Sequence, residues 1–102
     1  MAAEIDQSLR DEAWIGDAVL TLFVRSWLMK TRSKTIDPRE RAALFELFVS
    51  NQFLSSFGEP TRVEAKVGRI YREHGLQESF RHLEGTFVDK FLRTARNKGF
   101  NL

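Results

Sequence analysis

The heptapeptide WIGDAVL, residues 14–20, places a glycine and a carboxylate inside an otherwise apolar run. Apolar and small residues recur at helical spacing on both sides, which predicts a helix over about residues 8–30. A glycine in a helix interior costs about 1 kcal/mol relative to alanine, so Gly16 needs a reason such as close backbone contact. A carboxylate in apolar surroundings must be paired, hydrogen-bonded or bound to a metal ion. Gly16 and Asp17 together therefore predict a site on a rigid helix.

A capping pattern predicts the start of a second helix, over about residues 38–57. Asp37 is a good N-cap, Pro38 suits the first helical position, and Glu40 adds an acid to the first turn. The sequence Gly-Glu-Pro at residues 58–60 ends the segment. Apolar residues cover most of the circumference of this helix, which predicts a central position or a contact with a partner subunit.

The rest of the chain predicts two further helices, over about residues 61–74 and 77–96. Gly75 between them suits the C-terminus of a helix. Gly85 interrupts the last helix and predicts a bend, and residues 97–102 are expected to fray. The sequence has no sustained alternation of period two and no hairpin turn. It therefore predicts an all-α fold, a compact helical bundle.

Composition narrows the class of protein. A chain of 102 residues suits one domain, residues 1–102, that can fold alone. Nine Phe and two Trp are a heavy aromatic load for this length, so part of that surface is expected in a homodimer interface.

The absence of cysteine excludes disulfides and thiolate metal sites. A net charge of only +2 predicts no strong overall field for nucleic acid. Without a long apolar run or a leader pattern, we expect a soluble protein of the cytoplasm or an organelle matrix that contacts no membrane.

A second acid repeats the pattern of the first. Glu64 lies in the segment VEAKVG, residues 63–68, with Gly68 four residues later on the same helical face. If Gly16 and Gly68 mark a close crossing of two helices, Asp17 and Glu64 meet there. Two converging carboxylates suit Mg²⁺, which prefers a few hard oxygen ligands and keeps several waters. Such an ion can activate water and stabilise charge during phosphodiester cleavage.

The spacing by itself is weak support, because a Gly-Asp pair in a helix is more often a packing or surface feature. The motifs add a family resemblance. Residues 12–20, EAWIGDAVL, resemble the signature helix of the ribonuclease III catalytic domain, and residues 23–28 extend the match in the style of its Mini-ribonuclease III branch. Residues 48–54 are similar to the middle helix of the family. Residues 63–71 are similar to its second catalytic helix, and residues 74–76 to the following turn. These segments occur in the family's order and cover most of the chain.

The resemblance implies an all-α homodimer that cuts double-stranded or structured RNA with Mg²⁺, with Mn²⁺ as an alternative ion. Asp17 and Glu64 fall on the two central metal-binding and catalytic acids of the family. They would hold the ion that activates water. Thr61 would lie just outside the ligands of the ion; its alternative role is to cap the third helix.

The chain also departs from the family pattern. Ala13 and Thr61 stand where the usual signature has acids, as in the Mini branch, and Arg10 faces the side of Asp17. Only residues 58–60 remain of a longer family segment that includes a loop used on RNA. We also expect no double-stranded-RNA-binding domain, as in the Mini branch. These departures favour an alternative, a catalytically inactive relative that binds RNA or serves assembly. A plain helical dimerisation module is a third interpretation.

Other charged and aromatic residues each have two interpretations. A basic set at the end of the first helix either contacts RNA phosphates or is a solvated helix end: Arg25, Lys30, Arg32 and Lys34. Asp11 and Glu12 are expected on a solvated face, because helical angles place them away from Asp17. Three phenylalanines of the second helix are expected in the core or a dimer interface rather than in a base-stacking platform: Phe45, Phe48 and Phe53.

Overall fold

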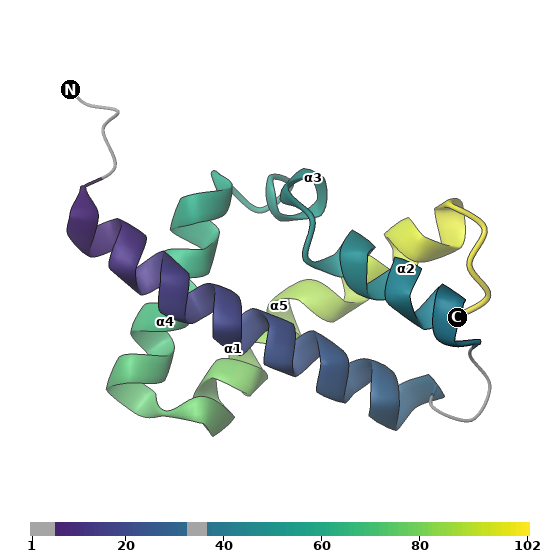
Figure 1. Cartoon of the computed structure of the whole chain (residues 1–102), viewed down its shortest axis with the longest axis horizontal. Helices are drawn as coiled ribbons and strands as arrows, with labels where there is room; N and C mark the ends of the chain where they lie inside the picture. Colours follow the sequence, from purple (N-terminus) through teal and green to yellow (C-terminus); the bar gives the residue numbers. More distant parts are fainter. Residues whose placement is uncertain (1–5, 33–36) are drawn as a thin grey trace.

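The computed structural model describes residues 6–32 and 37–102, and every regular element within them is an α-helix. The elements are α1 (Gln7–Arg32), α2 (Pro38–Phe48), α3 (Asn51–Leu54), α4 (Pro60–His74) and α5 (Leu76–Asn97). In Figure 1, α1 runs almost the whole length of the molecule, with α4 across its N-terminal half and α2 near its C-terminal half. This arrangement confirms the prediction of a compact all-α protein. None of the described helices is long and apolar enough to cross a membrane.

The prediction of a single helix over residues 38–57 is wrong, because the helix is interrupted between α2 and α3. The Ser50 Oγ donates to the carbonyl of Leu47 over 2.8 Å and accepts the backbone N–H of Phe53 over 3.1 Å. Ser50 thus closes α2, which ends at Phe48, and caps α3. A serine side chain that bonds its own backbone in this way competes with a continuous helix.

Carboxylates cap the two helices that begin with proline. The Asp37 side chain accepts the backbone N–H of Arg39 over 3.2 Å, as expected for the start of α2. At the start of α4 the cap is Glu59, which accepts the backbone N–H of Arg62 over 3.0 Å. The side chain that caps α4 is therefore Glu59 and not Thr61.

Residues 97–102 fold back onto the bundle instead of fraying. Gly99 has a φ of 97°, a value that favours glycine, and its N–H donates to the carbonyl of Arg96 over 3.0 Å. The N–H of Phe100 donates to the carbonyl of Ala95 over 3.0 Å. This pair of bonds turns the chain so that Phe100 and Leu102 lie partly buried against the core. The α5 helix itself continues through Gly85 without a break.

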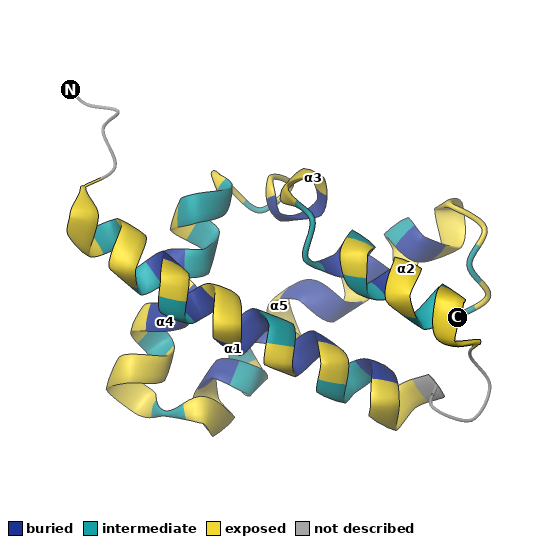
Figure 2. Ribbon diagram, viewed as in Figure 1, coloured by how far each residue is buried: buried dark blue, intermediate teal, exposed yellow. Residues whose placement is uncertain are grey.

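Phenylalanine rings fill the core beneath the C-terminal half of α1. In Figure 2 the buried stretches of α1, α2, α3 and α5 are dark blue. Phe48 of α2 stacks on Phe91 of α5 with ring centroids 4.2 Å apart, and Phe53 of α3 meets Phe48 edge-on at 5.4 Å. Phe48 and Phe53 are almost fully buried within one chain, which confirms their expected place in the core, whereas Phe45 is only partly buried and packs against the core. Most of the aromatic load therefore needs no partner subunit, with Trp14, 78% exposed, as the large exception.

Candidate functional site

Two glycines set the distance between α1 and α4. A Cβ atom built on Gly16 would lie 1.7 Å from the backbone oxygen of Glu64, and one on Gly68 would lie 2.0 Å from that of Glu12. Any other residue at either position would force the helices apart. The two backbones thus touch where the helices cross (Figure 1), as the glycines predicted.

The crossing brings Asp17 and Glu64 together, although 46 residues separate them in the chain. Burial raises the pKa of the half-buried Glu64 to about 7, and the hydrogen bond and the charge of Asp17 add to this effect. The charge of Glu59 contributes least. Near neutral pH Glu64 is therefore protonated in a large share of the molecules, because burial and a nearby carboxylate both disfavour its charged form.

The acid pair opens into a surface depression of about 500 Å³. Six residues of α1 and α4 line it: Arg10, Ala13, Trp14, Asp17, Thr61 and Glu64. The space is larger than a single ion needs, so an ion with its waters and a phosphate group would fit.

The ligand atoms in this depression are of the type that Mg²⁺ prefers, but only two carboxylates supply them. Asp17 and Glu64 supply hard oxygens, and an Mg²⁺ site in proteins commonly uses one or two carboxylates with waters and substrate oxygens. Within residues 6–32 and 37–102, no group of three acidic, histidine or cysteine side chains could hold an ion together. Arg10 adds a positive charge to the same depression. A divalent ion there would compete with the proton of Glu64 and would share the acids with a guanidinium.

Glu12 has a role that the sequence interpretation missed. Its side chain is only 15% exposed and accepts from Arg69 over 3.1 Å and from Arg72 over 3.5 Å. The expectation of a solvated face is wrong for Glu12, although it holds for the exposed Asp11. The available signal was position, since Glu12 lies one helical turn before Gly16 and so faces α4. This ion pair fastens the crossing and leaves Asp17 free of Arg69 and Arg72.

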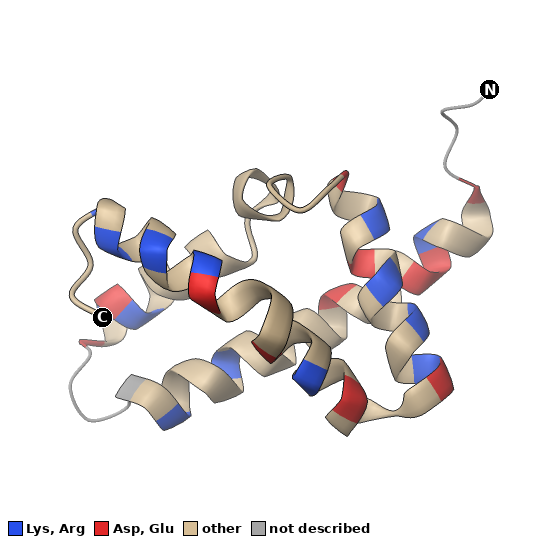
Figure 3. Cartoon of the chain, turned by 180° about the vertical axis from the view of Figure 1, so that it is seen from behind, with Lys and Arg blue, Asp and Glu red and all other residues tan. Residues whose placement is uncertain are grey.

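The basic set proposed for RNA contact does not gather at the acid pair. Arg25 lies eight residues beyond Asp17, about 12 Å farther along α1 at the usual rise per residue. Its guanidinium covers the Phe45 ring at 4.5 Å, whereas Lys30 lines a different depression. The side chain of Arg32 and the whole of Lys34 lie outside the described residues. Figure 3 shows basic residues distributed over several helices instead of one stripe.

Comparison with known proteins gives no relative of this chain. No family model matches it, and no curated protein and no solved structure is significantly similar to it.

Proposed function

We propose that this chain is an Mg²⁺-dependent endoribonuclease that acts on double-stranded or structured RNA. One observation carries the proposal: a glycine-to-glycine helix crossing holds Asp17 and Glu64 together in an open depression. The sequence resemblance to the ribonuclease III catalytic domain supplies the substrate class. The all-helical fold is consistent with it.

Each residue of the depression has a part in this proposal. Asp17 and Glu64 would hold the ion, which would activate water and stabilise charge on the phosphate. Thr61 hydrogen-bonds a water near the acids and orients it. Arg10 binds a phosphate oxygen of the RNA and offsets its negative charge beside the carboxylates. Because the backbones of α1 and α4 touch at the crossing, both acids stand on elements of fixed separation, and binding of the ion would displace the proton of Glu64.

The decisive experiment is cleavage of a double-stranded RNA in Mg²⁺ and in EDTA. Asp17→Asn and Glu64→Gln should each lower the rate at least about 100-fold, since each removes a charged ligand from a site with only two. Asp11→Asn is the matched control, because Asp11 is an exposed acid of α1 that accepts a hydrogen bond from Gln7 and does not line the depression. Cleavage that persists in both ligand variants, or in EDTA, would refute the proposal.

A catalytically inactive RNA-binding or assembly protein of the same fold is the second candidate. The sparse acid set and the guanidinium of Arg10 in the depression favour it. RNA binding in Mg²⁺ with no cleavage by the native chain, and equal affinity in Asp17→Asn, would decide for this second function. Neither binding nor cleavage would decide for an assembly role.

We also propose a homodimer formed along α1. Trp14, Ala18 and Leu22 are exposed and lie four residues apart, so they form one apolar stripe on the outer side of the helix. A two-fold axis through this stripe would bring two acid sites to one side of the dimer. Sedimentation should give a dimer for the native chain and a monomer for Leu22→Glu, whereas Thr86→Glu, an exposed site on α5, should remain dimeric. A monomeric native chain would exclude this arrangement.

A further inference from the structure

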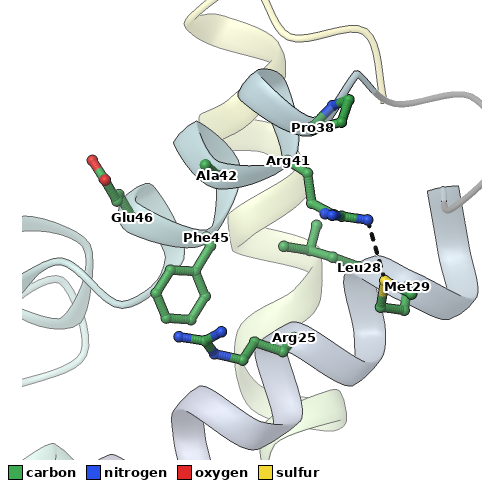
Figure 4. A pocket seen from close by; sticks show the side chains of 8 residues that line it. All are labelled: Arg25, Leu28, Met29, Pro38, Arg41, Ala42, Phe45 and Glu46. Atoms are coloured by element: carbon green, nitrogen blue, oxygen red, sulfur yellow. Dashed lines mark hydrogen bonds between the residues drawn. The ribbon is translucent and has the colours of Figure 1, made fainter.

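A second depression lies between α1 and α2, away from the acid pair (Figure 4). Its volume is about 480 Å³, within the range of small-molecule pockets in proteins. The floor is apolar and includes Leu28, Ala42 and Phe45. We refer to it as the α1–α2 groove.

Two arginines from different helices enter this groove. The Arg25 guanidinium of α1 lies over the Phe45 ring at 4.5 Å, and the Arg41 Nη1 of α2 donates to the sulfur of Met29 over 3.3 Å. Neither forms an ion pair with a carboxylate among residues 6–32 and 37–102. Figure 4 shows the carboxylate of Glu46 directed away from both guanidiniums.

The contacts of these arginines are weak substitutes for an anion. A thioether sulfur is a poor acceptor, and an aromatic face satisfies a guanidinium without any hydrogen bond to its N–H groups. Their N–H groups therefore retain capacity for a carboxylate or phosphate, which binds a guanidinium by charge-assisted hydrogen bonds. The same contacts hold both side chains against the groove, which reduces the entropy that a ligand would have to overcome.

We propose that the α1–α2 groove binds a small amphipathic anion. Its carboxylate or phosphate lies against Arg25 and Arg41, and its hydrocarbon body lies on the apolar floor. The positive charge disfavours cationic ligands, and the apolar floor disfavours bare inorganic anions. The proposal does not depend on the acid pair, so loss of RNA cleavage would leave it intact.

The test is titration of the full isotope-labelled chain by two-dimensional NMR, with probes below their micelle concentrations. Octanoate and octyl phosphate should shift the backbone amides of residues 25–29 and 38–46 with one saturating affinity. Octanol, which has the same body without charge, should bind at least about tenfold more weakly. A preference between the two anions identifies the head group, and either preference supports the site.

Matched variants show whether the two arginines cause the preference for an anion. Arg41→Gln should weaken octanoate about tenfold, the effect expected of one charged hydrogen bond, and Arg25→Gln should act in the same direction. Arg39→Gln removes the same charge from α2 outside the groove and should change the affinity by less than about twofold. Thermal unfolding of each variant verifies that the fold is retained.

Three results would contradict the proposal that the α1–α2 groove binds an anion. They are equal binding of octanol and octanoate, equal effects of Arg39→Gln and Arg41→Gln, or shifts confined to residues outside the groove. A short RNA duplex that shifts the groove amides when octanoate does not would also overturn it, in favour of a nucleic-acid surface.

Discussion

The two halves of α1 are held to the rest of the molecule in opposite ways. Around Gly16 the helix backbone touches the backbone of α4, and almost no side chain lies between them. From Phe23 to Leu28 the helix rests on buried phenylalanine rings of α2, α3 and α5. The first contact is determined by the absence of side-chain atoms, and the second by their volume.

This difference shows why the candidate site lies where it does. A backbone contact fixes the separation of the two helices, because no side chain lies between them that could change rotamer. Asp17 and Glu64 flank that contact and are therefore held together at the cost of partial burial. The aromatic half can absorb small changes of shape and carries no paired acids.

The largest expected effect is on the backbone contact. Gly16→Ala should lower the free energy of unfolding by more than about 3 kcal/mol, because its Cβ has no space beside the carbonyl of Glu64. Gly85→Ala is the matched control. Gly85 is helical with no atom within 4 Å of an added Cβ, so this change should stabilise α5 by up to about 1 kcal/mol. Urea unfolding of both variants measures the contrast, and a loss below 1 kcal/mol for Gly16→Ala would remove the distinction between the halves.

A smaller effect is expected in the aromatic half. Phe91→Leu at a fully buried position should cost about 1–1.5 kcal/mol, because surrounding rings can adjust to a smaller apolar side chain. Urea unfolding at the same pH as the glycine variants gives the comparison. A cost equal to that of Gly16→Ala would mean that both halves are equally intolerant.

The acid pair should make stability depend on pH. The pKa of Glu64 is about 7 in the folded state against an ordinary value of 4.5, so between these values the folded protein binds more protons than the unfolded chain. Stability should therefore be highest below pH 4.5 for this group and fall as pH rises to about 7. Glu64→Gln should gain about 1 kcal/mol relative to the native chain between pH 5 and pH 8, after allowance for solvent screening. Unfolding in EDTA at several pH values measures this, and parallel pH profiles for the two proteins would contradict it.

The smallest expected effect concerns the ion pair that fastens the crossing. Glu12→Gln should cost about 0.5–1 kcal/mol at low salt, and less at high salt, because its arginine partners are largely exposed. Glu84→Gln, an exposed acid of α5, should be neutral. Thermal unfolding at two salt concentrations checks this, and a salt-independent loss would assign the effect to packing instead of charge.

Much of the fold could be predicted because helix ends are local features. Residue types at short range predict the helix caps at Asp37 and Gly75. A glycine is unusual inside a helix, and this predicts the close crossing at Gly16 and Gly68. The break at Ser50 was missed because the apolar pattern continues through it. The folded C-terminal tail was also missed, since its anchor is the contact of Phe100 with a core assembled from other helices.

The candidate site was likewise predictable from the sequence only in part. The sequence by itself determined that Asp17 and Glu64 each sit in a helix beside a residue without a side chain, because spacing alone fixes which residues share a helical face. Only the tertiary structure decided which partner each acid has. Glu12 and Asp17 lie on the same helix, yet Glu12 meets two arginines of α4 whereas Asp17 meets another carboxyl group. The reason is that desolvation and charge depend on what the facing helix presents, and helical spacing carries no information about a neighbour in space.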